Sequence, residues 1–90
     1  MKQVFLKIYG QVHDVGLRYA TYRKAGELAL SGWVKNMPDG TVEVVAQGAE
    51  DGLQQFIAWT QVGSRFAQIQ KVKATWQKPE KIFKEFEIRY

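Results

Sequence analysis

Residues 33–46 read WVKNMPDGTVEVVA, in which two strand-like segments flank a tight turn. The turn is Met37-Pro38-Asp39-Gly40, and proline in its second position with glycine in its fourth is typical of a type I turn. The flanking segments, 33–36 and 41–46, have the length of short strands, and the second is rich in valine. The sequence therefore predicts a β-hairpin over residues 33–46.

A strand and a helix precede this hairpin. Val4, Leu6 and Ile8 occupy every second position, which is the period of a strand. Gly10 is expected to open a loop, and from about residue 18 the apolar period becomes helical. The helical stripe comprises Leu17, Thr21, Ala25 and Leu28, widened by Ala29. The Ser-Gly pair at 31–32 is expected to end the helix.

A second helix and two strands follow the hairpin. Residues 50–62 predict a helix, because apolar side chains recur on one face and the acidic first turn suits the helix dipole. Gly63 and Ser64 are expected to close it. Residues 69–76 predict a strand with a bulge near its start, where the alternation slips, and residues 85–90 alternate as a last strand.

This order of elements, β-α-β-β-α-β plus a terminal strand, predicts the α+β ferredoxin-like fold, with two helices on one face of an antiparallel sheet. Right-handed crossovers place the third strand between the first and the second. The first two strands then run parallel, and their C-terminal ends meet one edge of the sheet, roughly 9–10 Å apart. A chain of 90 residues predicts a single domain over residues 1–90.

The composition narrows the classes of protein. Hydrophobic residues make up 46% of the chain and charged residues 24%, as in globular domains. The formal charge of +4 is too small and scattered to indicate a nucleic-acid binder, and no apolar run is long enough to span a membrane. Cysteine is absent and histidine occurs once, so we expect no metal and no cofactor. The simplest expectation is a cytoplasmic monomer.

The loop from Gly10 to Leu17 joins a strand end to the N-terminus of a helix. N–H groups there have no acceptor within the helix and the dipole is positive, so the loop favours a phosphate or carboxylate. The alternative is an ordinary strand-to-helix turn. Arg18 favours an anion site, because a cation in the first turn is disfavoured unless an anion binds beside it. Otherwise Arg18 is a solvated surface residue.

Asn36 ends the second strand at the same edge. Its amide does not titrate near neutral pH, so it could orient a water molecule without deprotonating it. Alternatively, it is an asparagine favoured beside a turn. His13 is a candidate base, but a loop residue without a catalytic role is the better interpretation, because only the adjacent Asp14 offers it a carboxylate.

The remaining conspicuous side chains have structural interpretations. We expect the core to be filled or flanked by the aromatic residues Trp33, Phe56, Trp59 and Trp76. A solvated basic face, or a weak anion patch, is expected from Lys71, Lys73, Lys78, Lys81 and Lys84.

Two blocks of this sequence resemble the signature of the acylphosphatase family. The signature runs Gly-x-Val-Gln-Gly-Val-x-Phe-Arg, then a helix, then Gly-Trp-Val-(Arg/Lys)-Asn, a gap of two residues and Asp-Gly-x-Val-Glu-Val. The positions in register with it are Gly10, Val12, Val15, Gly16, Arg18, Gly32, Trp33, Val34, Lys35, Asn36, Asp39, Gly40, Val42, Glu43 and Val44. The Gly-Ser-x-x-Ala-x-Ile region from residue 63 and residues 86–90 are also similar, so the resemblance covers essentially the whole chain.

The resemblance implies the ferredoxin-like fold and an enzyme that hydrolyses acyl phosphates without a metal, a cofactor or a covalent intermediate. Arg18 and backbone N–H groups would hold the phosphate, and Asn36 would orient water for in-line attack on phosphorus. The implied N–H groups belong to Asp14, Val15, Gly16 and Leu17. Positioning and charge neutralisation would supply most of the catalysis, with the phosphate itself accepting the proton of the water.

The chain departs from the signature inside the loop, where His13-Asp14 replaces Gln-Gly and Leu17 replaces phenylalanine. A carboxylate about 5 Å from a bound phosphate would cost up to about 3 kcal/mol per unit charge at an effective dielectric of about 20. Screening shrinks this cost if the side chain turns to solvent. A glycine position also favours positive φ, which aspartate tolerates better than most residues. We therefore predict an enzyme weakened by Asp14.

Two other functions fit parts of the pattern. A non-catalytic anion-binding or interaction domain would keep the fold while Asp14 disables the loop. A single-stranded RNA binder would share the order of elements, but such domains stack bases on aromatic side chains of the third strand. Residues 41–46 contain none, and Glu43 would repel phosphate, so we expect no nucleic-acid partner.

Overall fold

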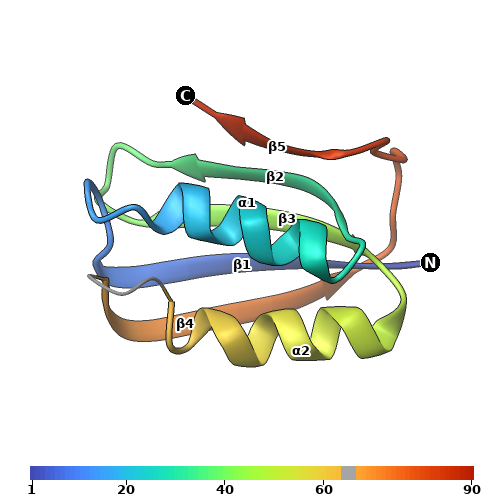
Figure 1. Cartoon of the computed structure of the whole chain (residues 1–90), viewed down its shortest axis with the longest axis horizontal. Helices are drawn as coiled ribbons and strands as arrows, with labels where there is room; N and C mark the ends of the chain where they lie inside the picture. The colour runs from blue at the N-terminus through green and yellow to red at the C-terminus, as the bar shows by residue number, and fades with distance from the viewer. Residues whose placement is uncertain (64–66) are drawn as a thin grey trace.

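The computed structural model describes residues 1–63 and 67–90. Its elements follow the chain in the order β1 (Lys2–Gln11), α1 (Leu17–Glu27), β2 (Ser31–Asn36), β3 (Val42–Gly48), α2 (Glu50–Thr60), β4 (Gln68–Gln77) and β5 (Phe86–Arg89). The predicted order of elements and the extra C-terminal strand are confirmed. Both helices cover the same face of the sheet (Figure 1). In the described part of the chain, no helix is long and apolar enough to cross a membrane.

The strands form one five-stranded sheet in the order β4-β1-β3-β2-β5. β3 pairs antiparallel with β1 and β2, so β1 and β2 run parallel as predicted. β4 adds antiparallel to β1, and their pairing skips Gln70, which confirms the predicted bulge. β5 adds parallel to β2, which makes the sheet mixed. The C-terminal ends of β1, β2 and β5 therefore share one edge, on the left of Figure 1.

The core lies between the sheet and the two helices. Alternate residues of β1 are fully buried, and these are Val4, Leu6 and Ile8. They belong to one cluster with Leu53 and Phe56 of α2. The buried stripe of α1 consists of Leu17, Thr21 and Ala25. Both periods found in the sequence therefore identify the faces that form the core, except that Ala29, expected to widen the stripe of α1, is exposed and lies beyond the end of the helix.

The aromatic residues expected in or beside the core divide into two groups. Phe56 is fully buried, and Trp59 stacks against it with ring centroids 6.2 Å apart. Trp33 faces the other side of the sheet, where the Arg89 guanidinium carbon lies 5.0 Å from its ring centroid. Trp33 therefore lies outside the core, and Trp76, on the edge strand β4, is 44% exposed, so the prediction is wrong for both residues. The five lysines of the expected basic face are exposed, as predicted.

Two glycines that were expected to mark element boundaries lie within strands instead. Gly10, expected to open the loop, belongs to β1, and Gly32, expected to end the helix, belongs to β2. Both have positive φ, +132° and +139°. A Cβ would lie 2.1 Å from the Gln68 carbonyl oxygen at Gly10, and 1.9 Å from the Val45 carbonyl oxygen at Gly32. α1 ends instead before Ala29, which has a φ of +56°.

The turn at residues 37–40 and the glycine after α2 were predicted more accurately than these two strand glycines. The Gly40 N–H donates to the Met37 carbonyl oxygen at 3.1 Å, which closes the predicted turn. α2 ends at Thr60, two residues before its predicted end, and Gly63 follows with a φ of +71°. Ser64, the other residue expected to close this helix, lies outside the described residues.

Candidate active site

The segment between β1 and α1 lies at the edge where β1, β2 and β5 end. It is shorter than predicted, because Gly10 and Gln11 still belong to β1. Asp14 has a φ of +58° and Gly16 a φ of +77°, so aspartate adopts the left-handed backbone that the glycine of the signature would take. α1 begins at Leu17 without a side-chain cap and without an acidic residue in its first turn. The positive end of its dipole is therefore not neutralised locally.

Arg18 and Asn36 line one cavity of about 120 Å³ at this edge. The loop, the first turn of α1 and the ends of β2 and β5 surround it. Among the described residues, the lining consists of Val12, Asp14, Gly16, Leu17, Arg18, Tyr19, Asn36, Ile88 and Tyr90. The structure thus brings together both catalytic candidates and the loop residues Asp14, Gly16 and Leu17. Val15 does not line the cavity, and its side chain packs against the core.

The Asn36 side chain presents an unpaired acceptor. Its Oδ1 atom is buried and has no hydrogen-bond partner in the described protein. A buried acceptor without a partner is costly, so this atom favours a water molecule or a donor group of a ligand. The next residue back, Lys35, lies opposite Glu43 in the register of β2 and β3. Its side chain is on the other face of the sheet from that of Asn36, because successive strand residues alternate.

The Arg18 guanidinium stacks on an aromatic ring. Its central carbon lies 4.8 Å from the ring centroid of Tyr90. Such stacking restrains the guanidinium plane while leaving its N–H groups able to bind an anion. Among residues 1–63 and 67–90, Arg18 has no salt bridge with a carboxylate, so its charge is available to a ligand.

Tyr90 and Ile88 were not predicted as cavity residues. The alternation of residues 85–90 places both on the face that carries the buried Phe86. That signal was visible in the sequence, but it points to this cavity only once β5 is known to lie beside β2.

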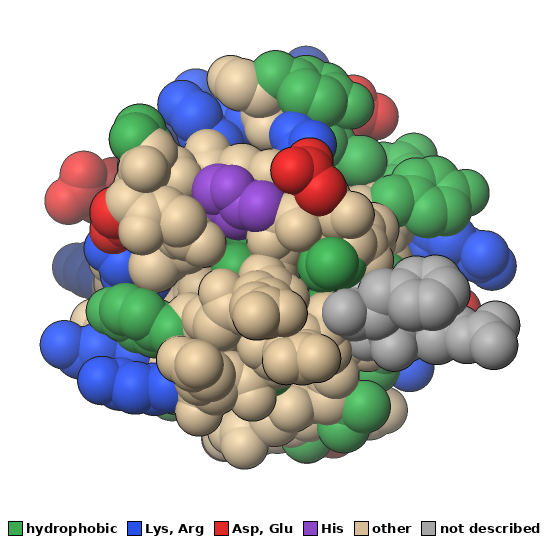
Figure 2. Space-filling view, turned by 90° about the vertical axis from the view of Figure 1, so that its left-hand side faces the viewer, with side chains coloured by type: hydrophobic (Ala, Val, Ile, Leu, Met, Phe, Trp, Pro, Cys, Tyr) green, Lys and Arg blue, Asp and Glu red, His purple; other side chains and the backbone are tan. Residues whose placement is uncertain are grey.

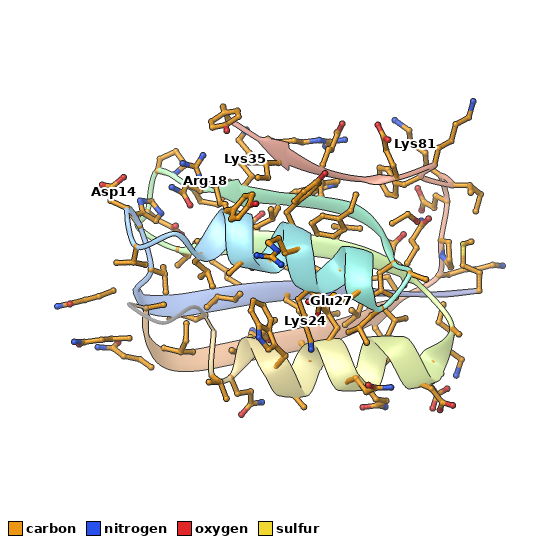
Figure 3. All side chains as sticks on the ribbon, in the orientation of Figure 1. Asp14, Arg18, Lys24, Glu27, Lys35 and Lys81 are labelled. Atoms are coloured by element: carbon orange, nitrogen blue, oxygen red, sulfur yellow. The ribbon has the colours of Figure 1, made fainter. Side chains whose placement is uncertain are left out.

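Asp14 lies at the outer tip of the loop, and Arg18 lies on the first turn of α1 beside it (Figure 3). The Asp14 side chain is exposed and projects outward from the loop in this view. Solvent therefore screens its carboxylate, which reduces its repulsion of an anion in the cavity below the unscreened cost.

His13 does not line the cavity. Its Nε2 atom donates a hydrogen bond to the Thr41 carbonyl oxygen at 2.9 Å, which leaves this nitrogen unable to act as a base. Figure 2 looks onto this edge of the molecule and shows the imidazole near an acidic and a basic side chain. The structure supports the interpretation of His13 as a loop residue.

The turn after Asn36 is held by Asp39. Its carboxylate accepts hydrogen bonds from the Thr41 hydroxyl at 2.6 Å and the Thr41 N–H at 3.0 Å, and pairs with Lys7 at 3.1 Å. These contacts, the Thr41 hydroxyl above all, lower the pKa of Asp39 to about 2. The hydrogen bond with Asp39 in turn raises the pKa of Lys7.

In the described ranges, no group of three or more His, Asp or Glu side chains is placed to hold a metal ion. The fold and the cavity define a class of protein, a ferredoxin-like domain with an arginine-containing cavity between a loop, a helix N-terminus and a strand end. The acylphosphatase family model matches residues 4–88, and the chain belongs to the acylphosphatase family.

Individual relatives agree with this assignment. An acylphosphatase of Thermococcus kodakarensis is 42% identical over 82 residues, covering 89% of this chain and 90% of the relative. An acylphosphatase of Bacillus licheniformis is 40% identical over 90 residues, the full length of both chains. The crystal structure of acylphosphatase from Bacillus subtilis is 36% identical and superposes with a TM-score of 0.96 over all of both chains. The resemblance and the predicted fold are confirmed.

Proposed function

We propose that this protein hydrolyses the carboxyl–phosphate bond of acyl phosphates to a carboxylate and inorganic phosphate. Family membership supports this reaction class. The observation that carries the proposed site is one cavity lined by both Arg18 and Asn36, with Oδ1 of Asn36 buried and without a hydrogen-bond partner among the described residues. The alternative of a non-catalytic anion-binding domain is not favoured, because acylphosphatases match this chain over nearly its whole length.

In the proposed complex, the phosphate of the substrate binds Arg18 and the backbone N–H groups of residues 14–17. The helix dipole and the guanidinium neutralise charge on the phosphoryl oxygens, which lowers the barrier to transfer. The same site would bind the inorganic phosphate product or a similar anion.

Asn36 orients the attacking water in this mechanism by accepting a hydrogen bond at Oδ1. The water oxygen forms a bond to phosphorus while the bond between phosphorus and the acyl oxygen breaks, and the carboxylate leaves with that electron pair. A neutral amide does not take up the proton of the water, so this proton passes to a phosphoryl oxygen. The carboxylate is a good leaving group, so positioning supplies much of the rate enhancement.

We also propose that residues 1–90 form one acylphosphatase-like domain that works as a monomer in the cytoplasm. The family match over residues 4–88 supports the single domain. The monomeric state is inferred from the sequence alone. The cytoplasmic location rests on the sequence composition. Sedimentation tests the monomeric state, and cell fractionation tests the cytoplasmic location.

Hydrolysis of benzoyl phosphate tests the proposed site. Arg18→Ala and Asn36→Ala should each lower kcat/KM by about 100-fold or more, as the loss of a charge-stabilising or positioning group does. Arg23→Ala is the matched control, because Arg23 is exposed on α1 and does not line the cavity. Absence of turnover by the folded, unmodified protein would reject the function, and full activity of Arg18→Ala or Asn36→Ala would reject the role of that residue.

A further inference from the structure

We propose that Asp14 makes this enzyme select acyl phosphates whose acyl group carries no negative charge. The inference rests on the proposed function, because it concerns the acyl part of a substrate whose phosphate occupies the same cavity. It starts from the charges of the lining. Among the nine described residues that line the cavity, Arg18 has the one positively charged side chain and Asp14 the one negatively charged side chain.

The size of the cavity determines where the acyl group lies. A volume of about 120 Å³ accommodates the phosphoryl group and its water, so a larger acyl group extends through the mouth. Tyr19 is 60% exposed and Tyr90 is 90% exposed, which places both rings at the rim, together with the exposed Asp14. The acyl group therefore meets two aromatic rings and one carboxylate.

No second cation among the described lining residues balances this carboxylate. The guanidinium of Arg18 is engaged by the phosphate in the proposed complex. Lys35 faces the opposite side of the sheet, and Lys24, further along α1, pairs with Glu27 at 3.4 Å (Figure 3). A carboxylate or second phosphate on the acyl group would therefore be repelled by Asp14, whereas an uncharged aryl or alkyl group would contact the tyrosine rings without that penalty.

Asp14→Asn removes the charge while keeping the shape of the loop. Asparagine tolerates the left-handed backbone at this position, where φ is +58°, as well as aspartate does. The matched control is Asp51→Asn, which removes the same charge from the exposed first turn of α2, away from the cavity.

The experiment compares benzoyl phosphate with 4-carboxybenzoyl phosphate, which differ by one carboxylate. The ratio of their kcat/KM values, benzoyl over carboxybenzoyl, should fall by about threefold to tenfold in Asp14→Asn at low ionic strength, and the fall should shrink as salt is added. Asp51→Asn should leave the ratio of the unmodified protein unchanged. The intrinsic reactivity of the two substrates cancels in this comparison between variants.

A binding measurement separates this inference from the proposed function. Benzylphosphonate and 4-carboxybenzylphosphonate are not hydrolysed, and the ratio of their Kd values should depend on Asp14 in the same direction. An unchanged ratio in Asp14→Asn, or an equal change in Asp51→Asn, overturns the inference even if benzoyl phosphate is hydrolysed. If neither acyl phosphate is hydrolysed but the phosphonate ratio shifts in Asp14→Asn, the proposed function fails and the charge selection stands.

Discussion

The imidazole of His13 donates a hydrogen bond from Nε2 to the carbonyl oxygen of Thr41 across 2.9 Å. The same oxygen accepts the N–H of Met37 at 2.8 Å, and Met37 directly follows Asn36. One carbonyl group therefore links the loop before α1 to the segment that carries the proposed water-orienting amide. His13 stands where the family signature has glutamine, and both side chains offer an N–H donor.

His13→Ala should loosen this link and lower kcat for benzoyl phosphate by about tenfold, because misplaced catalytic groups are costly. Loss of a partly buried hydrogen bond should also lower the free energy of unfolding by about 1 kcal/mol. His13→Gln keeps a donor and should recover most of kcat. Steady-state kinetics and urea denaturation measure both effects, and an unchanged kcat in His13→Ala would show that the link does not position Asn36.

Asp39 should make the stability of the fold depend on acidic pH. Its pKa is about 2 in the folded protein, below the ordinary value of 3.8, chiefly because the Thr41 hydroxyl donates to the carboxylate. A carboxyl group with a lowered folded pKa binds fewer protons when folded than when unfolded. Its stabilising contribution is therefore complete above about pH 4 and is lost as the pH falls to about 2.

Asp39→Asn should flatten this part of the pH profile. The measurement is urea denaturation of the unmodified protein and the variant at intervals between about pH 5 and pH 2. Glu80→Gln is the control, since that carboxylate is exposed, lies outside the helices and has no ion pair among the described residues. Parallel profiles for the unmodified protein and Asp39→Asn would contradict the assignment.

Rules that involve only neighbouring residues explain which parts of the fold were predictable from the sequence. The turn at 37–40 and the bulge in β4 follow from residue types and alternation within a few positions, and both were predicted. Gly10 and Gly32 were misplaced because a glycine that ends an element looks the same in sequence as one that a neighbouring strand closely approaches. The parallel pairing of β5 with β2 depends on the path of the chain between β4 and β5, which the alternation of residues does not encode.

The same distinction applies to the site. Arg18 and Asn36 were identified because each has a local signal, a cation against a helix dipole and an amide at a strand end. The contact of Tyr90 with Arg18 and the bond from His13 to Thr41 join segments far apart in the sequence. From a single sequence, contacts between such distant residues cannot be predicted until the order of the strands in the sheet is known.

Gly32→Ala should be severely destabilising. A Cβ at this position would lie 1.9 Å from the Val45 carbonyl oxygen, and the φ of +139° is unfavourable for alanine. The free energy of unfolding should fall by about 3 kcal/mol or more, because backbone atoms must move. Gly26→Ala is the matched control, since a Cβ there has open space on α1, and it should stabilise the protein by about 0.5–1 kcal/mol. Similar stabilities of the two variants in urea would contradict the close approach of β2 and β3.

Tyr90→Ala should weaken the binding of phosphate by removing the ring that restrains Arg18. A cation–π contact at an exposed site contributes about 0.5–1 kcal/mol, so the inhibition constant of inorganic phosphate should rise by about twofold to fivefold. Tyr90→Phe keeps the ring and should resemble the unmodified protein, and Tyr22→Ala, an exposed tyrosine outside the cavity lining, is the control. An equal loss in Tyr90→Phe would mean that the hydroxyl group, and not the stacked ring, positions the guanidinium.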